Sequence, residues 1–165
     1  RASILTVLFP GDNIHKTGDL SRIESGDYTG SKITQRQIVD VAVTSDGNSI
    51  GAYGSETFQG ENILYRKASG EFISYFVKGK SFKSRQDIQT GFKSDASVAL
   101  YMNTATDSEG VNGKIVSPGT DVTFYAPDIS SVRLEGNKLP IVDTGSNWLR
   151  VNIPKGTYNL ELMNN

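Results

Sequence analysis

The chain of 165 residues carries 17 basic and 18 acidic side chains, one histidine and no cysteine. The length is typical of one domain with a substantial core, and the lack of cysteine excludes a disulfide framework, a thiolate zinc site and a cysteine nucleophile. The single histidine excludes multi-histidine metal sites, and a net charge of −1 argues against a nucleic-acid binder, which usually carries a basic excess.

The chain begins with a strand-like segment, residues 3–9, which Pro10-Gly11 ends. No stretch approaches the roughly 18 apolar residues of a transmembrane helix, and no signal-peptide pattern is present. We therefore expect no membrane span, and we interpret residues 1–165 as a single domain that is a fragment or module of a larger secreted protein. Residues 10–36 are polar and weakly patterned, which predicts a long loop with at most one helical turn, at Asp19–Glu24.

His15 in this predicted loop is the only conventional proton shuttle for neutral pH. A hydrolase triad would need it beside a serine and an acid, and the sequence has no Gly-x-Ser-x-Gly elbow. A pair of carboxylates for glycoside hydrolysis stays open, although Glu135, Glu161 and Asp121 occupy positions typical of outward-facing solubilising residues. We expect the chain by itself to have no catalytic residue.

Four later segments alternate apolar and polar residues with the period of two that is typical of half-buried strands. Their apolar members should face the core, and the polar members should face solvent. The expected core sets are Val98, Leu100 and Met102; Val122, Phe124 and Ala126; Leu149, Val151 and Ile153; and Tyr158, Leu160 and Leu162.

Residues typical of turns lie between short apolar segments at the spacing of an antiparallel meander. The sequence therefore predicts an all-β fold, an antiparallel β-sandwich of many short hairpin-connected strands. The expected turns are Asp46-Gly47-Asn48, Ser69-Gly70, Lys78-Gly79-Lys80, Asn112-Gly113, Ser117-Pro118-Gly119-Thr120, Gly136-Asn137 and Pro154-Lys155-Gly156.

Two oxygen-rich clusters are compatible with a structural calcium ion: Asp12-Asn13 with Asp19, and Asp107 with Glu109. Solvated loop acids explain the same residues more simply. We therefore expect no metal site and no cofactor.

Aromatic residues on the polar sides of the predicted strands are the candidate carbohydrate-binding residues. Trp148 lies on the face opposite Leu149 and shares it with Arg150, and Tyr125 and Tyr101 are placed in the same way on their strands. A flat aromatic ring suits the apolar face of a sugar, and Arg150 and Lys93 would supply charge for uronate or sulfate groups. The alternative is that a further layer or a partner domain packs on this face.

Several segments, taken in order, carry a family resemblance: Leu5–Pro10, Ile63–Lys67, Phe92–Asp95, Val98–Tyr101, Val122–Tyr125, Val132–Lys138 and Leu149–Gly156. They resemble the C-terminal β-sandwich region of heparinase II/III-like polysaccharide lyases. The resemblance implies a secreted or periplasmic bacterial protein that cleaves uronic-acid-containing polysaccharides by β-elimination. In that family a helical toroid, which has no counterpart in these residues, supplies much of the catalytic cleft, so no catalytic residue is carried over. The family's metal site in the sheet region uses histidine and acid ligands, and it is not carried over because this sequence has a single histidine.

The sequence thus predicts a non-catalytic module of an extracellular polysaccharide lyase. Its expected partners are the helical catalytic domain of the parent chain and an acidic polysaccharide or oligosaccharide, with no nucleic acid. The alternative is an independent carbohydrate-binding module or adhesin-like surface domain. The first hypothesis predicts an exposed apolar patch where the catalytic domain docks, and the second predicts an exposed aromatic strip without such a patch.

Overall fold

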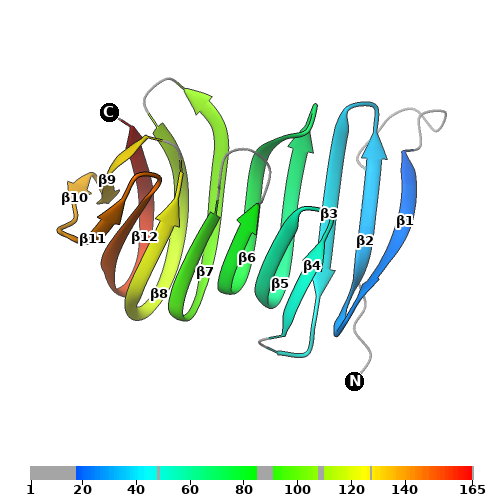
Figure 1. Ribbon diagram of the computed structural model, residues 1–165, viewed down its shortest axis with the longest axis horizontal. Coiled ribbons are helices and arrows are strands. Elements are labelled where there is room, and N and C mark those ends of the chain that lie inside the picture. The colour runs from blue at the N-terminus through cyan, green and yellow to red at the C-terminus, as the bar shows by residue number, and fades with distance from the viewer. Residues whose placement is uncertain (1–17, 48, 85–90, 108–109, 127, 165) are drawn as a thin grey trace.

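The computed structural model describes residues 18–47, 49–84, 91–107, 110–126 and 128–164. Within these residues all regular structure is β, and the strands form one antiparallel sheet in the order β1-β2-β3-β5-β6-β7-β8-β12-β9-β10, with β4 beside β5 and β11 beside β12 (Figure 1). The predicted first strand at residues 3–9, His15, Asp12-Asn13 and Glu109 lie outside the described residues.

The strands differ widely in length. The five longest, β5, β6, β7, β8 and β12, lie side by side, and β9, β10 and β11 complete the sheet next to β12. The bounds of the strands are β1 (Asp19–Ser25), β2 (Tyr28–Gln35), β3 (Ile38–Thr44), β4 (Ile50–Tyr53), β5 (Glu56–Ala68), β6 (Glu71–Ser84), β7 (Gly91–Asp107), β8 (Gly110–Tyr125), β9 (Ile129–Leu134), β10 (Asn137–Lys138), β11 (Ile141–Gly145) and β12 (Trp148–Asn164). No helix that could cross a membrane is found among the described residues.

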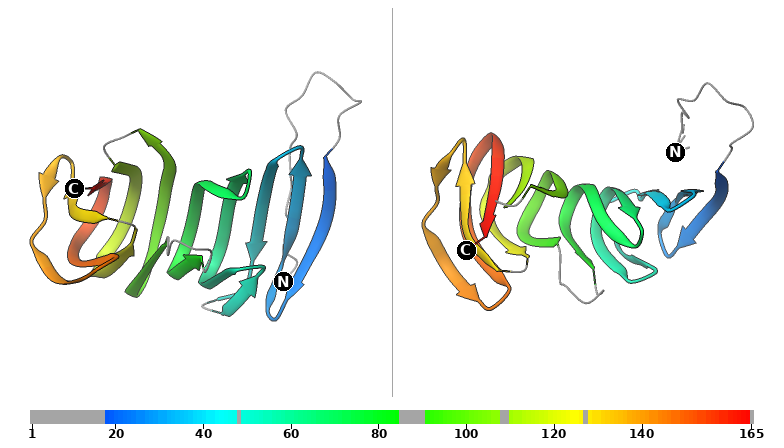
Figure 2. Two further views of the ribbon diagram at one scale, coloured as in Figure 1. Left: turned by 45° about the horizontal axis from the view of Figure 1, so that its top comes forward. Right: turned by 90° about the horizontal axis from the view of Figure 1, so that it is seen from above.

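The long strands fold back on themselves. In β6 the rings of Phe72 and Phe82 have centroids 5.7 Å apart, although ten residues of straight strand would separate them by about 33 Å. In β5 the Lys67 ammonium lies 2.6 Å from the Glu56 carboxylate, eleven residues away. The right panel of Figure 2 shows the same curl along the neighbouring strands. Each long strand therefore contributes to two arms of one folded sheet.

We name these arms by the residues of their paired strands. The first arm contains residues 56–59, 81–84, 91–94, 120–125 and 148–153, and the second contains residues 62–68, 71–78, 98–103, 110–116 and 157–163. The prediction of an all-β antiparallel fold is confirmed. The sandwich is not confirmed, because the strand order joins both arms into a single sheet.

Four of the predicted turns are wrong, and three of those four segments lie at the bends between the arms. Lys78-Gly79-Lys80 is inside β6, Asn112-Gly113 and Ser117–Thr120 are inside β8, and Pro154-Lys155-Gly156 is inside β12. Most of these segments are bends or bulges within continuous strands. Glycine and proline occur at such positions as well as in turns.

The bend between β5 and β6 depends on a pair of facing glycines. Gly60 and Gly79 are register partners between two shifts of the ladder. A Cβ atom on Gly60 would collide with the carbonyl of Lys78, and one on Gly79 would collide with the carbonyl of Gln59. The close approach of the two backbones therefore requires a residue without a side chain at both positions.

Two further predictions of local structure are corrected. The predicted loop at residues 10–36 contains β1 and β2, so Asp19–Glu24 is a strand and not a helical turn. The predicted hairpin turn at Gly136-Asn137 is displaced by one residue, because Glu135 and Gly136 have positive φ and Asn137 begins β10. Ser69-Gly70 connects β5 to β6 as predicted.

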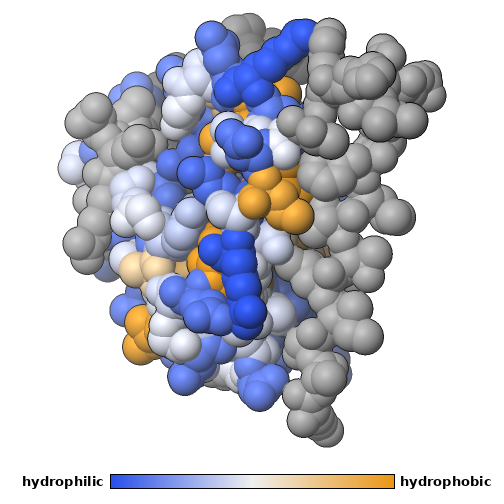
Figure 3. Space-filling model, turned by 90° about the vertical axis from the view of Figure 1, so that its right-hand side faces the viewer, coloured by the Kyte–Doolittle hydropathy of each residue, from blue (hydrophilic) through white to orange (hydrophobic). Residues whose placement is uncertain are grey.

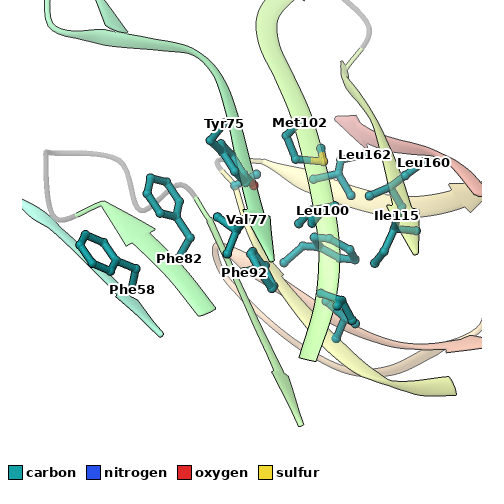
Figure 4. Close-up of a cluster of buried hydrophobic side chains, with 14 of the residues drawn as sticks. Phe58, Tyr75, Val77, Phe82, Phe92, Leu100, Met102, Ile115, Leu160 and Leu162 are labelled. Atoms are coloured by element: carbon teal, nitrogen blue, oxygen red, sulfur yellow. The ribbon is translucent and has the colours of Figure 1, made fainter. Parts of the chain in front are cut away.

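The core fills the space between the two arms. A row of aromatic residues crosses the first arm through the register pairs Phe58–Phe82, Phe82–Phe92 and Phe92–Phe124. Phe82 also stacks on Tyr75 of the second arm, with ring centroids 4.9 Å apart (Figure 4). The predicted alternation is confirmed: Val98, Leu100, Met102, Val122, Phe124, Ala126, Leu149, Val151, Ile153, Leu160 and Leu162 are buried, and Tyr158 packs partly buried against them.

A buried ion pair joins the two arms at Glu56. This carboxylate is only 3% exposed and accepts hydrogen bonds from Lys67 Nζ at 2.6 Å, from the Tyr65 hydroxyl at 3.2 Å and from Ser55. Burial, reinforced by the neighbouring Glu56, raises the pKa of Tyr65, so its hydroxyl stays protonated and donates. We call Glu56, Tyr65 and Lys67 the clasp.

The end of the sheet at β1 is largely polar (Figure 3). This strand carries Asp19, Arg22 and Glu24, and an ion pair of 2.6 Å joins Arg22 to Glu24. The exposed apolar side chains of this region, Leu20, Ile38 and Ile50, come from three different strands. Charged residues of this kind on an edge strand disfavour pairing with another sheet.

Candidate functional site

The outer face of the first arm brings together four of the five predicted site residues. Trp148 of β12 and Tyr125 of β8 are register partners. Two residues along the strands, Arg150 pairs with Thr123, which in turn pairs with Lys93 of β7. Directly opposed residues of antiparallel strands point to the same side of the sheet, so these side chains share one surface.

Lys83 of β6 belongs to the same surface, although the sequence did not identify it. It pairs with Gly91, and Gly91 pairs with Tyr125. Because Gly91 has no side chain, the lysine reaches across it, and its ammonium lies 4.7 Å from the centre of the Tyr125 ring. This is a cation–π contact, and it places a positive charge beside the aromatic pair. We call Trp148, Tyr125, Lys83 and Lys93 the aromatic–lysine face.

The Trp148 indole is held in place by a neighbouring strand. Trp148 is half-buried and pairs with Gly145 of β11. A Cβ atom on Gly145 would collide with the indole nitrogen, so the ring lies directly against the glycine backbone. A ring fixed in this way loses little conformational entropy when a ligand binds.

Arg150 was predicted to be available for uronate or sulfate groups, but in the structure it is already paired with acidic side chains. Its Nη2 atom lies 2.9 Å from a carboxylate oxygen of Asp95 and 3.0 Å from one of Asp121. The Asn152 amide donates to the second Asp121 oxygen at 2.7 Å. Hydrogen bonds from Asn152 and Arg150 hold the pKa of Asp121 below its usual value. The guanidinium is therefore already matched by carboxylates.

Lys93 has a different environment. It is exposed, it lies between Ser81 and Thr123 in the ladder, and it forms no ion pair with any residue that the structure describes. Its ammonium can therefore meet an anionic ligand without first breaking a bond to a carboxylate.

Tyr101, the fifth predicted residue, lies on the second arm. It pairs with Phe76 and Lys114, and Phe76 pairs with Leu64. Leu64, Tyr101 and Val116 are 46%, 43% and 49% exposed. Val116, which pairs with Ala99, lies in the next row of the ladder. We call Leu64, Phe76 and Tyr101 the apolar row. The alternation of apolar and polar residues correctly predicted that Tyr101 faces outward. It did not predict that Tyr101 lies on the second arm, away from Trp148 and Tyr125.

In the described part of the chain, no group of three or more histidine, cysteine or acidic side chains is arranged to hold a metal ion. Of the predicted calcium clusters, Asp19 begins β1 and Asp107 ends β7, while their partners Asp12, Asn13 and Glu109 fall outside the described residues.

The sequence matches no protein-family model, and a comparison with curated proteins finds no match either.

Proposed function

We propose that the chain is a non-catalytic β-module of an extracellular polysaccharide lyase, and that it contacts acidic glycans through the aromatic–lysine face. One observation carries the glycan-binding part: the ladder places Trp148 beside Tyr125, with Lys83 and Lys93 on the same surface. The assignment to a lyase, and with it secretion or a periplasmic location, rests on the sequence resemblance described above.

The two kinds of residue on this face match the two properties of a uronic-acid-containing sugar. Adjacent aromatic rings offer an apolar surface for the C–H face of a pyranose. Lys83 and Lys93 lie in adjacent rows of the ladder, one beside the rings and one exposed. Their ammonium groups can bind the carboxylate of the sugar that stacks on the rings.

The apolar row favours the hypothesis of a lyase module over that of an independent carbohydrate-binding or adhesin-like domain. Leu64, Phe76 and Tyr101 pair across three strands on the outside of the second arm. We propose that this row packs on the helical catalytic domain of the parent chain. The two arms would then have separate tasks, the first for glycan and the second for docking.

Replacing Trp148 by alanine should weaken glycan binding by about tenfold or more, because a central aromatic residue of a binding surface commonly contributes about 2 kcal/mol. The measurement is retardation of the chain in native gels that contain hyaluronan, with thermal unfolding as the check on folding. Tyr101→Ala is the matched control, because it removes an exposed aromatic residue from the opposite arm and should leave retardation unchanged. Equal migration of wild type and Trp148→Ala at all hyaluronan concentrations would contradict the proposal.

A further inference from the structure

Two carboxylates form ion pairs with Arg150 at one side of the aromatic–lysine face, and a third lies next to it in the ladder. Asp95 and Asp121 form ion pairs with it at 2.9 and 3.0 Å, and Asp143 of β11 is its register partner. Asp95 and Asp143 are exposed. We call Asp95, Asp121 and Asp143 the acidic rim.

Charge is therefore divided across this one surface. Lys83 of β6 lies beside the Tyr125 ring, and Lys93 of β7 lies in the next row of the ladder, which also contains Thr123 and Arg150. The acidic rim lies on β7, β8 and β11 next to the Arg150 guanidinium. The lowered pKa of Asp121 keeps this carboxylate ionised throughout the neutral range. One arginine cannot neutralise three carboxylates, so the rim keeps a net negative charge.

The rim also has polar groups that suit an uncharged sugar. The carboxylates accept hydrogen bonds from sugar hydroxyls, and the exposed Asn152 side chain, which bonds Asp121, lies in the same row. A sulfate or carboxylate at this position would instead lie beside like charges, which costs binding energy and is a common source of specificity.

Taking the proposed glycan-binding function as given, we infer that the face selects glycans of low charge density. One uronate is bound by Lys83 and Lys93, and an uncharged sugar lies over the acidic rim. Densely sulfated glycans are rejected because their next anionic group meets Asp95, Asp121 and Asp143.

The test compares two probes on the intact chain at about 0.15 M salt, where charges separated by more than about 8 Å are screened. Hyaluronan alternates one uronate with one uncharged sugar, whereas heparin is densely sulfated. Wild type should bind hyaluronan more tightly than heparin. The double variant Asp95→Asn/Asp143→Asn should bind heparin about tenfold more tightly than wild type does, so the ratio of hyaluronan affinity to heparin affinity should fall well below the wild-type ratio.

The control is Glu24→Gln/Glu71→Gln, which changes net charge by the same amount at two exposed positions on β1 and β6. An equal gain in heparin binding by this control would overturn the inference, because net charge alone would explain it. Equal wild-type affinity for heparin and hyaluronan would also overturn the inference. If the Trp148→Ala variant then lost binding to both glycans, the proposed function would still hold. Binding to neither probe would reject the proposed function as well.

Discussion

Replacing Phe82 by alanine is expected to lower the free energy of unfolding by about 3–5 kcal/mol. Phe82 is fully buried, and its ring contacts Tyr65, Phe72 and Tyr75, all of which lie on the second arm. Its removal would open a cavity where the two arms meet, and continuous strands leave little freedom to close it. Urea denaturation at equilibrium measures the change.

Two companion variants separate the cavity from a general effect of substitution. Phe82→Leu keeps most of the volume and should cost less than about 1.5 kcal/mol. Phe72→Ala removes a ring that is only half-buried and should cost less than Phe82→Ala. If Phe82→Ala unfolds at the wild-type urea concentration, the core between the arms is not where the structure places it.

Replacing Glu56 by glutamine is expected to cost about 3 kcal/mol, because it removes the negative charge of a largely buried ion pair and keeps the positive charge of Lys67. The side chains of Glu56 and Lys67 are only 3% and 12% exposed. Glutamine keeps the size of the side chain but has one acceptor oxygen where the carboxylate has two, so the loss reports the missing charge together with a lost acceptor. Urea denaturation again provides the measurement.

The double variant Glu56→Gln/Lys67→Met tests whether the two charges act as a pair. Removing the lysine as well should restore most of the lost stability, since replacement of a whole buried ion pair is often nearly neutral. A double variant as unstable as the sum of the two single variants would show that the clasp does not couple its members.

Alternation of apolar and polar residues predicts which side of a strand is buried, and it does so correctly in β7, β8 and β12. The same sequence does not show where a strand ends. Ser117-Pro118-Gly119 has the composition of a turn, but Pro118 pairs with Lys155 of β12, so the segment is a bend within β8. Only the neighbouring strand distinguishes the two structures, and that partner is 37 residues away.

The prediction of a loop at residues 10–36 was wrong because the local sequence does not show which strands pair. In β1 only Ile23 is buried, and in β2 only Tyr28 and Ile33 are buried. Strands at the edge of a sheet need few apolar residues, because much of their surface meets solvent. The pairing of β1 with β2, and of β2 with β3, supplies the order that the local pattern does not predict.

The candidate site, too, was predicted only in the part that depends on strand parity. Parity alone placed Trp148, Tyr125, Arg150 and Lys93 on outward faces, and the register then gathered them on one arm. Lys83 could not be found from its own segment, because its contact with Tyr125 depends on Gly91 lying between them in the ladder. The two carboxylates that form ion pairs with Arg150 come from β7 and β8, so the local sequence around Arg150 does not predict them.

Trp148 is the single tryptophan of the chain, so its fluorescence reports directly on the proposed glycan surface. Titration with hyaluronan should produce a saturable change in its emission, and the folded Lys83→Gln/Lys93→Gln variant should show at least about a tenfold weaker response. Wild-type emission that stays constant across the titration would contradict glycan binding at the aromatic–lysine face, as would an unchanged response in the lysine variant.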